Sequence, residues 1–324
     1  MYAITQKEYG GPDTLEWSKV ADPHPAPGEV IIDVTATAVN RADILQREGK
    51  YPPPTGVTDT LGLECSGTIV SVGAALTMDR IGERVTALLA GGGYAQKVAV
   101  PIGQIMTVPE GVSLVDAGGL PEVACTVWSN LKHVLNLREG ETILIHGGGS
   151  GIGTMAIQVA KAMGATVVVT AGSQDKLNTC AALGADYLIN YKDEDFVQRI
   201  NTDLGGVDAI LDNMGASYLE RNIDALKRNG RIVIIGMQGG TVAEFNIAQA
   251  LRKNVTISAT SLRARPENEK AAICREVEKV IWPWITDGIV KLVIDRVMPI
   301  AQAPAAQELI EQGEATGKII LQVR

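Results

Sequence analysis

A buried strand, a glycine-rich turn and an amphipathic helix follow one another without a gap from Thr142 to Gly164. The apolar run 142–146 suits a strand that is buried in a parallel sheet, and the segment 147–153, GGGSGIG, forces a tight turn after it. Apolar residues then recur at helical spacing from Ile152 to Met163, so one face of the helix packs against the sheet. This order predicts a strand–turn–helix unit of an α/β fold.

The turn has the chemistry of a phosphate site. A turn without Cβ atoms lets backbone N–H groups approach a ligand, and the helix N-terminus behind it favours negative charge. Ser150 stands where the middle glycine of the strict G-x-G-x-x-G pattern falls, so an ordinary strand-to-helix turn is the alternative. A second strand, 166–170, follows at the distance that a βαβ unit requires, which favours a dinucleotide pyrophosphate as the ligand. The expected contacts are Gly148, Ser150, Gly151, Ile152 and Gly153.

The end of the second strand indicates which dinucleotide binds. No carboxylate stands there to bind a ribose 2′-hydroxyl, and the chain continues with Gly172 and Ser173, followed by Lys176. A hydroxyl and an ammonium suit a 2′-phosphate, so the predicted cofactor is NADPH. The alternative is that Ser173 caps a helix, Asp175 lies in its first turn and Lys176 is solvated, and both interpretations can hold together.

Composition excludes several classes of protein. The 324 residues carry a net charge of −8 without a basic run, which argues against nucleic acid or an anionic membrane surface as the main partner. No stretch is long and apolar enough to span a membrane, and the N-terminus does not resemble a signal peptide. The four cysteines form no C-x-x-C pair. We therefore expect a cytoplasmic protein without a disulfide framework or a cysteine-rich metal site.

Two kinds of pattern divide the chain. Short strands broken by Gly and Pro predict a β barrel or sandwich over about the first 108 residues, at 30–34, 67–72, 84–88 and 95–100. From about 116 to 261, strands alternate with helices, and further strands at 208–211, 231–235 and 255–259 predict a doubly wound parallel sheet. A helix from about Pro266, broken near Pro283, and a strand at 319–323 would complete the β domain. The predicted domains are 1–117, 118–262 and 263–324.

The layout resembles the medium-chain dehydrogenase/reductase superfamily, which implies a Rossmann domain and a GroES-like β-barrel domain. Within it, the motifs are similar to those of the zinc-free quinone oxidoreductases, most of all the tumour-suppressor-inducible type, which shares Ser150. The motifs are 40–43 (NRAD), 62–64 (GLE), 89–93 (LAGGG), 121–122 (PE) and 146–153.

The resemblance implies that this chain holds no zinc. Asn40 and Leu63 stand where the zinc alcohol dehydrogenases of the superfamily have a cysteine and a histidine, and the four-cysteine loop expected after 91–93 is absent. The three histidines are scattered, whereas tetrahedral zinc needs several converging ligands. Without a Lewis acid, reduction of an electron-poor acceptor is favoured over oxidation of an alcohol.

The resemblance also implies roles for individual residues. Asn40, Gln46 and Tyr51 would lie near the nicotinamide in a cleft facing the β domain, with Tyr51 a donor to a developing oxyanion. Packing of Tyr51 on Pro52 and Pro53 is the alternative, and Asn40 is equally suited to a turn. By the same resemblance, Tyr191, Leu262 and Arg263 would contact the cofactor. Asn213, Gly236, Met237 and Gln238 follow the strands 208–211 and 231–235, whose C-terminal ends face the ligand cleft, and Lys318 is expected near the C-terminal end of that cleft. His146 is expected to hydrogen-bond the phosphate turn rather than to donate a proton.

Three functions remain open. The first is NADPH-dependent reduction of quinones by hydride transfer, and the second is reduction of a conjugated double bond in an enone or enoyl thioester. The third is an NADPH-binding protein with a structural or RNA-binding role and no turnover, although the acidic balance counts against RNA. The resemblance also implies a homodimer joined through the edge strand predicted at 255–259.

Overall fold

The computed structural model describes residues 1–324, and the chain divides into two compact units. The first contains residues 1–125, 262–288 and 292–324, and the second contains residues 126–261 and 289–291. The first unit runs past the boundary predicted at residue 117, because the backbone N–H of Glu122 donates to Glu64 and Cys125 packs against Cys274.

The second unit is built on a parallel sheet of six strands, as predicted for a Rossmann domain. The strand order is β10 (Tyr187–Asn190), β9 (Thr166–Ala171), β8 (Thr142–His146), β11 (Val207–Asp212), β12 (Leu226–Ile234) and β13 (Thr256–Ala259). The order runs outward from β8 in both directions, so the topological switch point lies between β8 and β11. Ligands of open α/β sheets bind beyond the carboxyl ends of the strands at this point.

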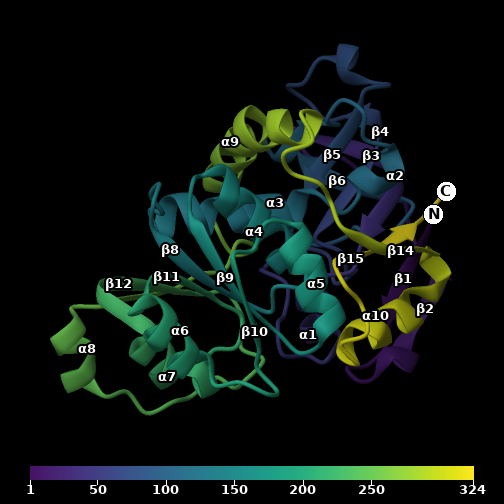
Figure 1. Cartoon of the computed structure of the whole chain (residues 1–324). Coiled ribbons are helices and arrows are strands. Elements are labelled where there is room, and N and C mark those ends of the chain that lie inside the picture. The colour runs from purple at the N-terminus through teal and green to yellow at the C-terminus, as the bar shows by residue number, and fades with distance from the viewer. The chain divides into compact units, whose positions relative to one another are not determined.

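Helices cover both faces of this sheet. Figure 1 shows α4 (Gly151–Ala162) and α5 (Gln174–Ala182) on one side and α6 (Phe196–Leu204) and α7 (Leu219–Ala225) on the other. A further helix, α8 (Ile247–Lys253), precedes the edge strand β13. The central strands β8, β9 and β11 are buried on both faces, and side chains of the sheet pack with those of α6 and α7 into one core.

The first unit contains a sheet of seven strands that is mostly antiparallel. Its order is β14 (Ile294–Pro299), β15 (Lys318–Gln322), β3 (Glu29–Ala38), β4 (Glu64–Val72), β5 (Arg84–Leu88) and β7 (Ile105–Thr107), and β6 (Lys97–Pro101) also pairs with β3. Ile320 lies opposite Ala38, so the C-terminal segment completes the GroES-like sheet as predicted. A separate pair, β1 (Tyr2–Gln6) and β2 (Leu15–Lys19), is antiparallel.

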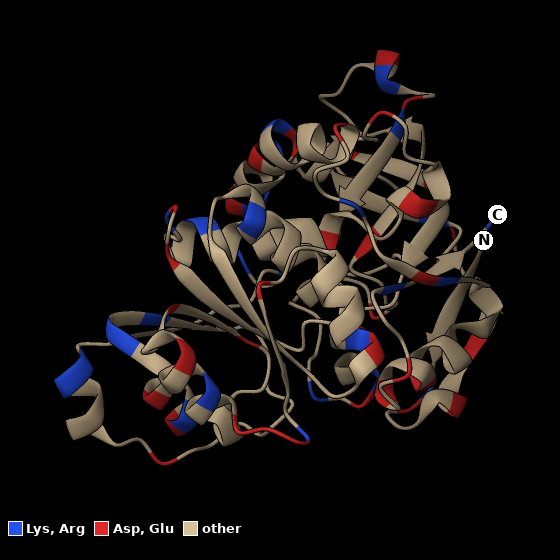
Figure 2. Cartoon of the chain, in the orientation of Figure 1, with Lys and Arg blue, Asp and Glu red and all other residues tan.

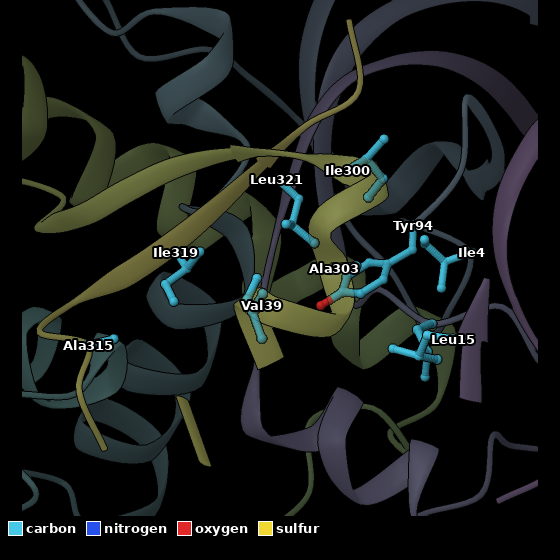
Figure 3. Close-up of a cluster of buried hydrophobic side chains, with 11 residues drawn as sticks. Ile4, Leu15, Val39, Tyr94, Ile300, Ala303, Ala315, Ile319 and Leu321 are labelled. Atoms are coloured by element: carbon cyan, nitrogen blue, oxygen red, sulfur yellow. The ribbon is translucent and has the colours of Figure 1, made fainter. Parts of the chain in front are cut away.

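Four helices lie within the first unit, and a fifth crosses its boundary. They are α1 (Arg41–Arg47), α2 (Leu114–Ala117), α9 (Glu267–Thr286), α10 (Ala303–Glu311) and α3 (Pro121–Trp128), which ends in the second unit. Figure 3 shows the apolar cluster in which Tyr94 packs with Ile4, Leu15 and Ile300. The cluster joins the N-terminal strands to the C-terminal return, so both ends of the chain contribute to one core.

The break that was predicted in the C-terminal helix is wrong. Helix α9 continues through Pro283 to Thr286. Pro283 lies within the last turn of the helix, so its missing N–H removes only one late hydrogen bond, and its carbonyl still accepts from Asp287.

Acidic and basic residues are interspersed in both units (Figure 2), and no helix is long and apolar enough to cross a membrane.

Candidate functional site

The glycine-rich turn after β8 has almost no free space along its backbone. Gly147 has a φ of +67°, and a Cβ at Gly153 would lie 2.3 Å from the carbonyl oxygen of Gly147. Ser150 caps α4, because its Oγ accepts from Gly153 N at 3.0 Å and donates to Gly147 O at 2.8 Å. The serine thus supports the turn in place of the expected glycine, and the N-terminal turn of α4 follows directly.

Neighbouring elements pack closely on the glycines of this turn. A Cβ at Gly148 would lie 2.9 Å from Cys180 Sγ, and one at Gly149 would lie 3.0 Å from the aliphatic chain of Lys176. Lys176 therefore crosses the turn, as a residue near the phosphates would. A larger residue at position 148 would displace Cys180 or Val169, and one at position 149 would require the Lys176 chain to shift.

The end of β9 gathers the residues predicted for a 2′-phosphate. Ser173 caps α5, accepting from Lys176 N at 3.4 Å. A Cβ at Gly172 would lie 2.4 Å from Tyr191 Oη and 3.4 Å from Lys192 Cε. Tyr191 is half exposed beside this glycine. Lys192 was missed in the sequence, although its place directly after Tyr191 brings a second ammonium to the group.

The ends of β11 and β12 supply an unpaired acceptor. The side-chain oxygen of Asn213 is buried without a hydrogen-bond partner, and its Nδ2 lies 2.6 Å from where a Cβ of Gly147 would be. A Cβ at Gly236 would lie 2.7 Å from Asn213 O. Because a buried amide oxygen without a donor is costly, this position suits a ligand that donates to it. The residues present therefore fit a dinucleotide cradle.

A buried carboxylate supports this edge. Asp212 accepts from Met214 N at 2.7 Å and from Gly215 N, and burial raises its pKa to about 6. The following loop is tied back to the same place, since Gln238 N donates to Asn213 O at 3.3 Å. Met237 is half exposed in that loop.

His146 does not hydrogen-bond the phosphate turn, so that prediction is wrong. Its Nδ1 lies 3.0 Å from Thr170 Oγ1, and its Nε2 lies 2.8 Å from Asn222 Oδ1. Phe196 and Tyr218 pack edge-on against the ring. The ring points into the core beneath β8, where burial lowers its pKa to about 4, and so it acts as a neutral packing residue.

In the first unit, Asn40 is held by two buried charges. Its Nδ2 donates to Glu64 Oε1 at 2.8 Å, and its Oδ1 accepts from Lys318 Nζ at 2.7 Å. Lys318 also donates to Glu64 Oε1 at 2.8 Å and to Val39 O at 3.1 Å. The Lys318 ammonium thus has three acceptors within this unit, and one of them is the side-chain oxygen of Asn40.

A second buried acid fixes the backbone at the same helix end. Asp43 accepts from Asn40 N at 2.8 Å and Gly62 N at 3.0 Å, and Tyr94 Oη lies 3.3 Å away. Burial raises the pKa of Asp43 to about 6. Neither Asp43 nor Glu64 was singled out in the sequence as part of a site. The signal that could have found Asp43 is the spacing N-x-x-D, which is typical of a helix start.

Tyr51, Gln46 and Arg263 form a third group in this unit. The Tyr51 ring faces the guanidinium of Arg263 at 5.4 Å, and Tyr51 O accepts from Arg263 Nη1 at 3.4 Å. Gln46 Nε2 donates to Asp59 O at 2.9 Å, whereas Gln46 Oε1 and Arg263 Nη2 are buried without partners. These unpaired groups can meet a polar ligand. Leu262, next to Arg263, is buried.

Comparison with known proteins decides the family. The chain is 30% identical to the quinone oxidoreductase of Mus musculus over 99% of its own length and 97% of that protein. The chain belongs to the quinone oxidoreductase family of the medium-chain dehydrogenases/reductases. Models of the alcohol dehydrogenase GroES-like domain and of the zinc-binding dehydrogenase match residues 26–110 and 151–277, respectively.

Other oxidoreductases are also similar to this chain over nearly its whole length. The Escherichia coli quinone oxidoreductase, solved with NADPH, is 26% identical with a TM-score of 0.90, covering 99% of this chain and 100% of that one. A 2-haloacrylate reductase from Burkholderia sp. is 28% identical over 99% of this chain and 98% of its own length. In the present chain, no group of three or more His, Cys, Asp or Glu side chains is placed to hold a metal ion.

Proposed function

We propose that this protein reduces quinones with NADPH and without zinc. The observation that carries the proposal is the network around Asn40. The position that holds a cysteine in the zinc relatives is occupied by an amide whose two ends are fixed by Glu64 and Lys318. The buried ammonium places a positive charge there and balances the carboxylate, so the site has a cation of its own.

The end of β9 supports NADPH rather than NADH. It carries no carboxylate, and it gathers a hydroxyl, a phenol and two ammonium groups from Ser173, Tyr191, Lys176 and Lys192. A dianionic 2′-phosphate is matched by such donors, whereas a 2′-hydroxyl gains little from them. The orphaned oxygen of Asn213 and the bare turn 147–153 would hold the rest of the dinucleotide.

When bound, NADPH supplies a hydride. The protein binds the cofactor and the acceptor, orients them, and balances the charge that develops. We assign Tyr51, Gln46 and Asn40 to the acceptor. A quinone that accepts a hydride also takes up a proton, and the Tyr51 hydroxyl would donate a hydrogen bond to the oxygen on which negative charge develops. The guanidinium of Arg263 faces the Tyr51 ring. Its positive charge stabilises negative charge on the Tyr51 phenol.

Steady-state oxidation of NADPH and NADH across ortho- and para-quinones and conjugated enones tests the proposal. We expect quinone turnover with a lower KM for NADPH. Lys192→Met should raise the KM for NADPH at least fivefold and leave the KM for NADH unchanged. Lys7→Met, at an exposed position of the first unit, is the matched control. Equal KM values for the two cofactors would contradict the assignment of the 2′-phosphate site.

Reduction of a conjugated double bond is the second candidate, favoured by the similarity to a 2-haloacrylate reductase. Turnover of enones without turnover of quinones in the same panel would establish it. Cofactor binding without turnover of either class would instead indicate a protein with a structural or RNA-binding role.

We also propose a homodimer formed through the edge strand β13. That strand ends the six-stranded sheet, so one row of its backbone groups lacks a strand partner. The preceding segment exposes large apolar side chains, among them Val242, Ile247 and Leu251, at 90%, 64% and 74% of their surfaces. A second copy of this chain would cover both features.

A further inference from the structure

A cavity of about 430 Å³ opens in the first unit, at strands β5 and β6 and the start of helix α9. This volume lies in the range of small-molecule sites. Its lining includes the apolar Val57, Leu88 and Val98, the polar Gln104 and Lys270, and the carboxylate of Glu267. None of Asn40, Gln46 and Tyr51 lines it, so it is distinct from the residues assigned to the quinone.

An ammonium without a protein acceptor lies in the wall of this cavity. Lys270 is only 7% exposed, and no oxygen of the chain accepts a hydrogen bond from its Nζ. Burial lowers the pKa of Lys270, whereas the exposed Glu267 nearby acts in the opposite direction. Arg263 adds a second positive charge in the neighbourhood. A largely buried cation without a hydrogen-bond acceptor is costly, and Glu267 offsets only part of its charge, so an anion that enters the cavity beside Lys270 is favoured.

An unpaired amide lies in the same wall. Gln104 is 3% exposed, and its Oε1 is buried without a hydrogen-bond partner. The two residues come from elements in direct contact, since a Cβ at Gly103 would lie 2.8 Å from the Ala271 side chain. The amide Nε2 makes no hydrogen bond within the chain and is not among the fully buried atoms, so Gln104 offers a second donor beside Lys270.

The rest of the wall suits a flat apolar body. Leu88, Val98 and Val100 are almost fully buried and present aliphatic side chains. Gly91 and Gly92 leave one side bare, where a Cβ at Gly92 would lie 3.0 Å from Val98. Besides Gln104 and Lys270, the lining carries Lys97, which pairs with Asp22, and the carboxylates of Glu29 and Glu267. The cavity thus combines an apolar floor with a few polar and charged groups, the usual composition of a pocket for an amphipathic small molecule.

We propose that this cavity binds an apolar carboxylate, such as an aromatic acid, through Lys270 and Gln104. The carboxylate would accept from the Lys270 ammonium and from the Gln104 amide, while the ring system lies against the aliphatic wall. Arg263 joins this site to the quinone site, because its Nε donates to Ala90 O in the cavity wall and its guanidinium faces the Tyr51 ring. A ligand here would therefore contact the backbone that positions Tyr51.

Calorimetric titration of the full chain with 2-naphthoate, without cofactor, tests the site. We expect one binding event that Lys270→Met weakens at least tenfold. Gln104→Glu should weaken it at least as much, because the new carboxylate pairs with Lys270 and repels the ligand. Lys279→Met, at an exposed position of the same helix, should leave the affinity unchanged. Thermal unfolding of each variant checks that it is folded.

Several outcomes would overturn the proposal. They are no binding of 2-naphthoate at millimolar concentration, equal affinity in the Lys270→Met variant, and equal affinity for the neutral 2-naphthamide. Loss of binding in Tyr51→Phe together with normal binding in Lys270→Met would move the ligand to the quinone site. Because turnover is not measured, failure here leaves quinone reduction untouched, and failure of quinone reduction leaves this site untouched.

Discussion

Lys318 and Asn40 lie 278 residues apart in the sequence, and the Lys318 ammonium donates a 2.7 Å hydrogen bond to Asn40 Oδ1. Lys318 begins β15, the strand by which the C-terminal segment joins the sheet of the first unit. The same ammonium compensates Glu64, which is completely buried. Closing the sheet therefore also orients the amide that we assign to the quinone.

Lys318→Met should destabilise the protein strongly. Removing one partner of a buried ion pair leaves Glu64 charged and unpaired, which costs about 3–5 kcal/mol of unfolding free energy. Lys318→Met combined with Glu64→Gln should recover a large part of this loss, because no uncompensated charge remains. Urea unfolding of both variants measures the two values. A single variant that is as stable as the parent would show that the pair is not formed in solution.

Gly153→Ala and Ser150→Gly lie in the same turn but should differ greatly in their effect on NADPH binding. The new Cβ at position 153 would lie 2.3 Å from Gly147 O, a backbone atom, so the turn must open and NADPH binding should fall more than tenfold. Ser150→Gly removes the helix cap and the bond to Gly147 O but introduces no clash, and loss of a cap to glycine costs only a few tenths of a kcal/mol. Fluorescence titration with NADPH compares them, and a normal affinity in Gly153→Ala would contradict the close packing described here.

The parts of the fold that depend on neighbouring residues were predictable from the sequence. Strand 142–146, the turn and helix α4 follow from local apolar spacing and from the steric freedom of glycine, and the structure confirms them. The cap at Ser173 was recognised for the same reason, because Ser173 and Lys176 are three residues apart. The family resemblance predicted the order of the two domains along the chain.

The contacts between residues far apart in the sequence were not predictable. His146 was expected to support the turn beside it, but its partner Asn222 lies 76 residues away on helix α7. The role of Glu64 depends on Lys318, which reaches it only when β15 pairs with β3. Single-sequence patterns contain no information on such pairs. The assignment of Tyr51, Gln46 and Tyr191 to ligands stays a prediction, as does the finer likeness to the tumour-suppressor-inducible type.

The stability of the protein should depend on His146 between pH 6.5 and 4. The folded-state pKa of about 4 lies below the ordinary value of 6.5, so the unfolded chain binds a proton first as the pH falls. Stability is then lost with decreasing pH across this window, by roughly 3 kcal/mol at most for a shift of this size. Urea unfolding at pH 4.5, 5.5 and 7 measures the slope.

The His146→Gln variant isolates this contribution. Asp43 and Asp212 have raised pKa values of about 6, so each lowers stability as the pH rises from 3.8 towards 6, opposite to His146. Both carboxyls stay in the variant, and the difference between parent and variant cancels their effect. That difference should grow with pH between 4 and 6.5. A constant difference would show that the His146 ring is not buried in the neutral form.

Leu251→Glu should weaken the proposed dimer. Leu251 lies on α8, immediately before the edge strand β13, and 74% of its surface is exposed in the single chain. A carboxylate there would have to be desolvated against the second copy, which costs several kcal/mol and shifts the association to higher concentration.

Met78→Glu is the matched control, because Met78 is equally exposed, at 73%, in the first unit, far along the chain from β13. Sedimentation velocity between 0.5 and 50 μM, about the range that resolves micromolar association, should show a dimer for the parent and for Met78→Glu, and a monomer for Leu251→Glu at the lower concentrations. A parent chain that sediments only as a monomer would mean that the edge of β13 is left to solvent, and that the apolar side chains of 242–251 serve some contact other than self-association.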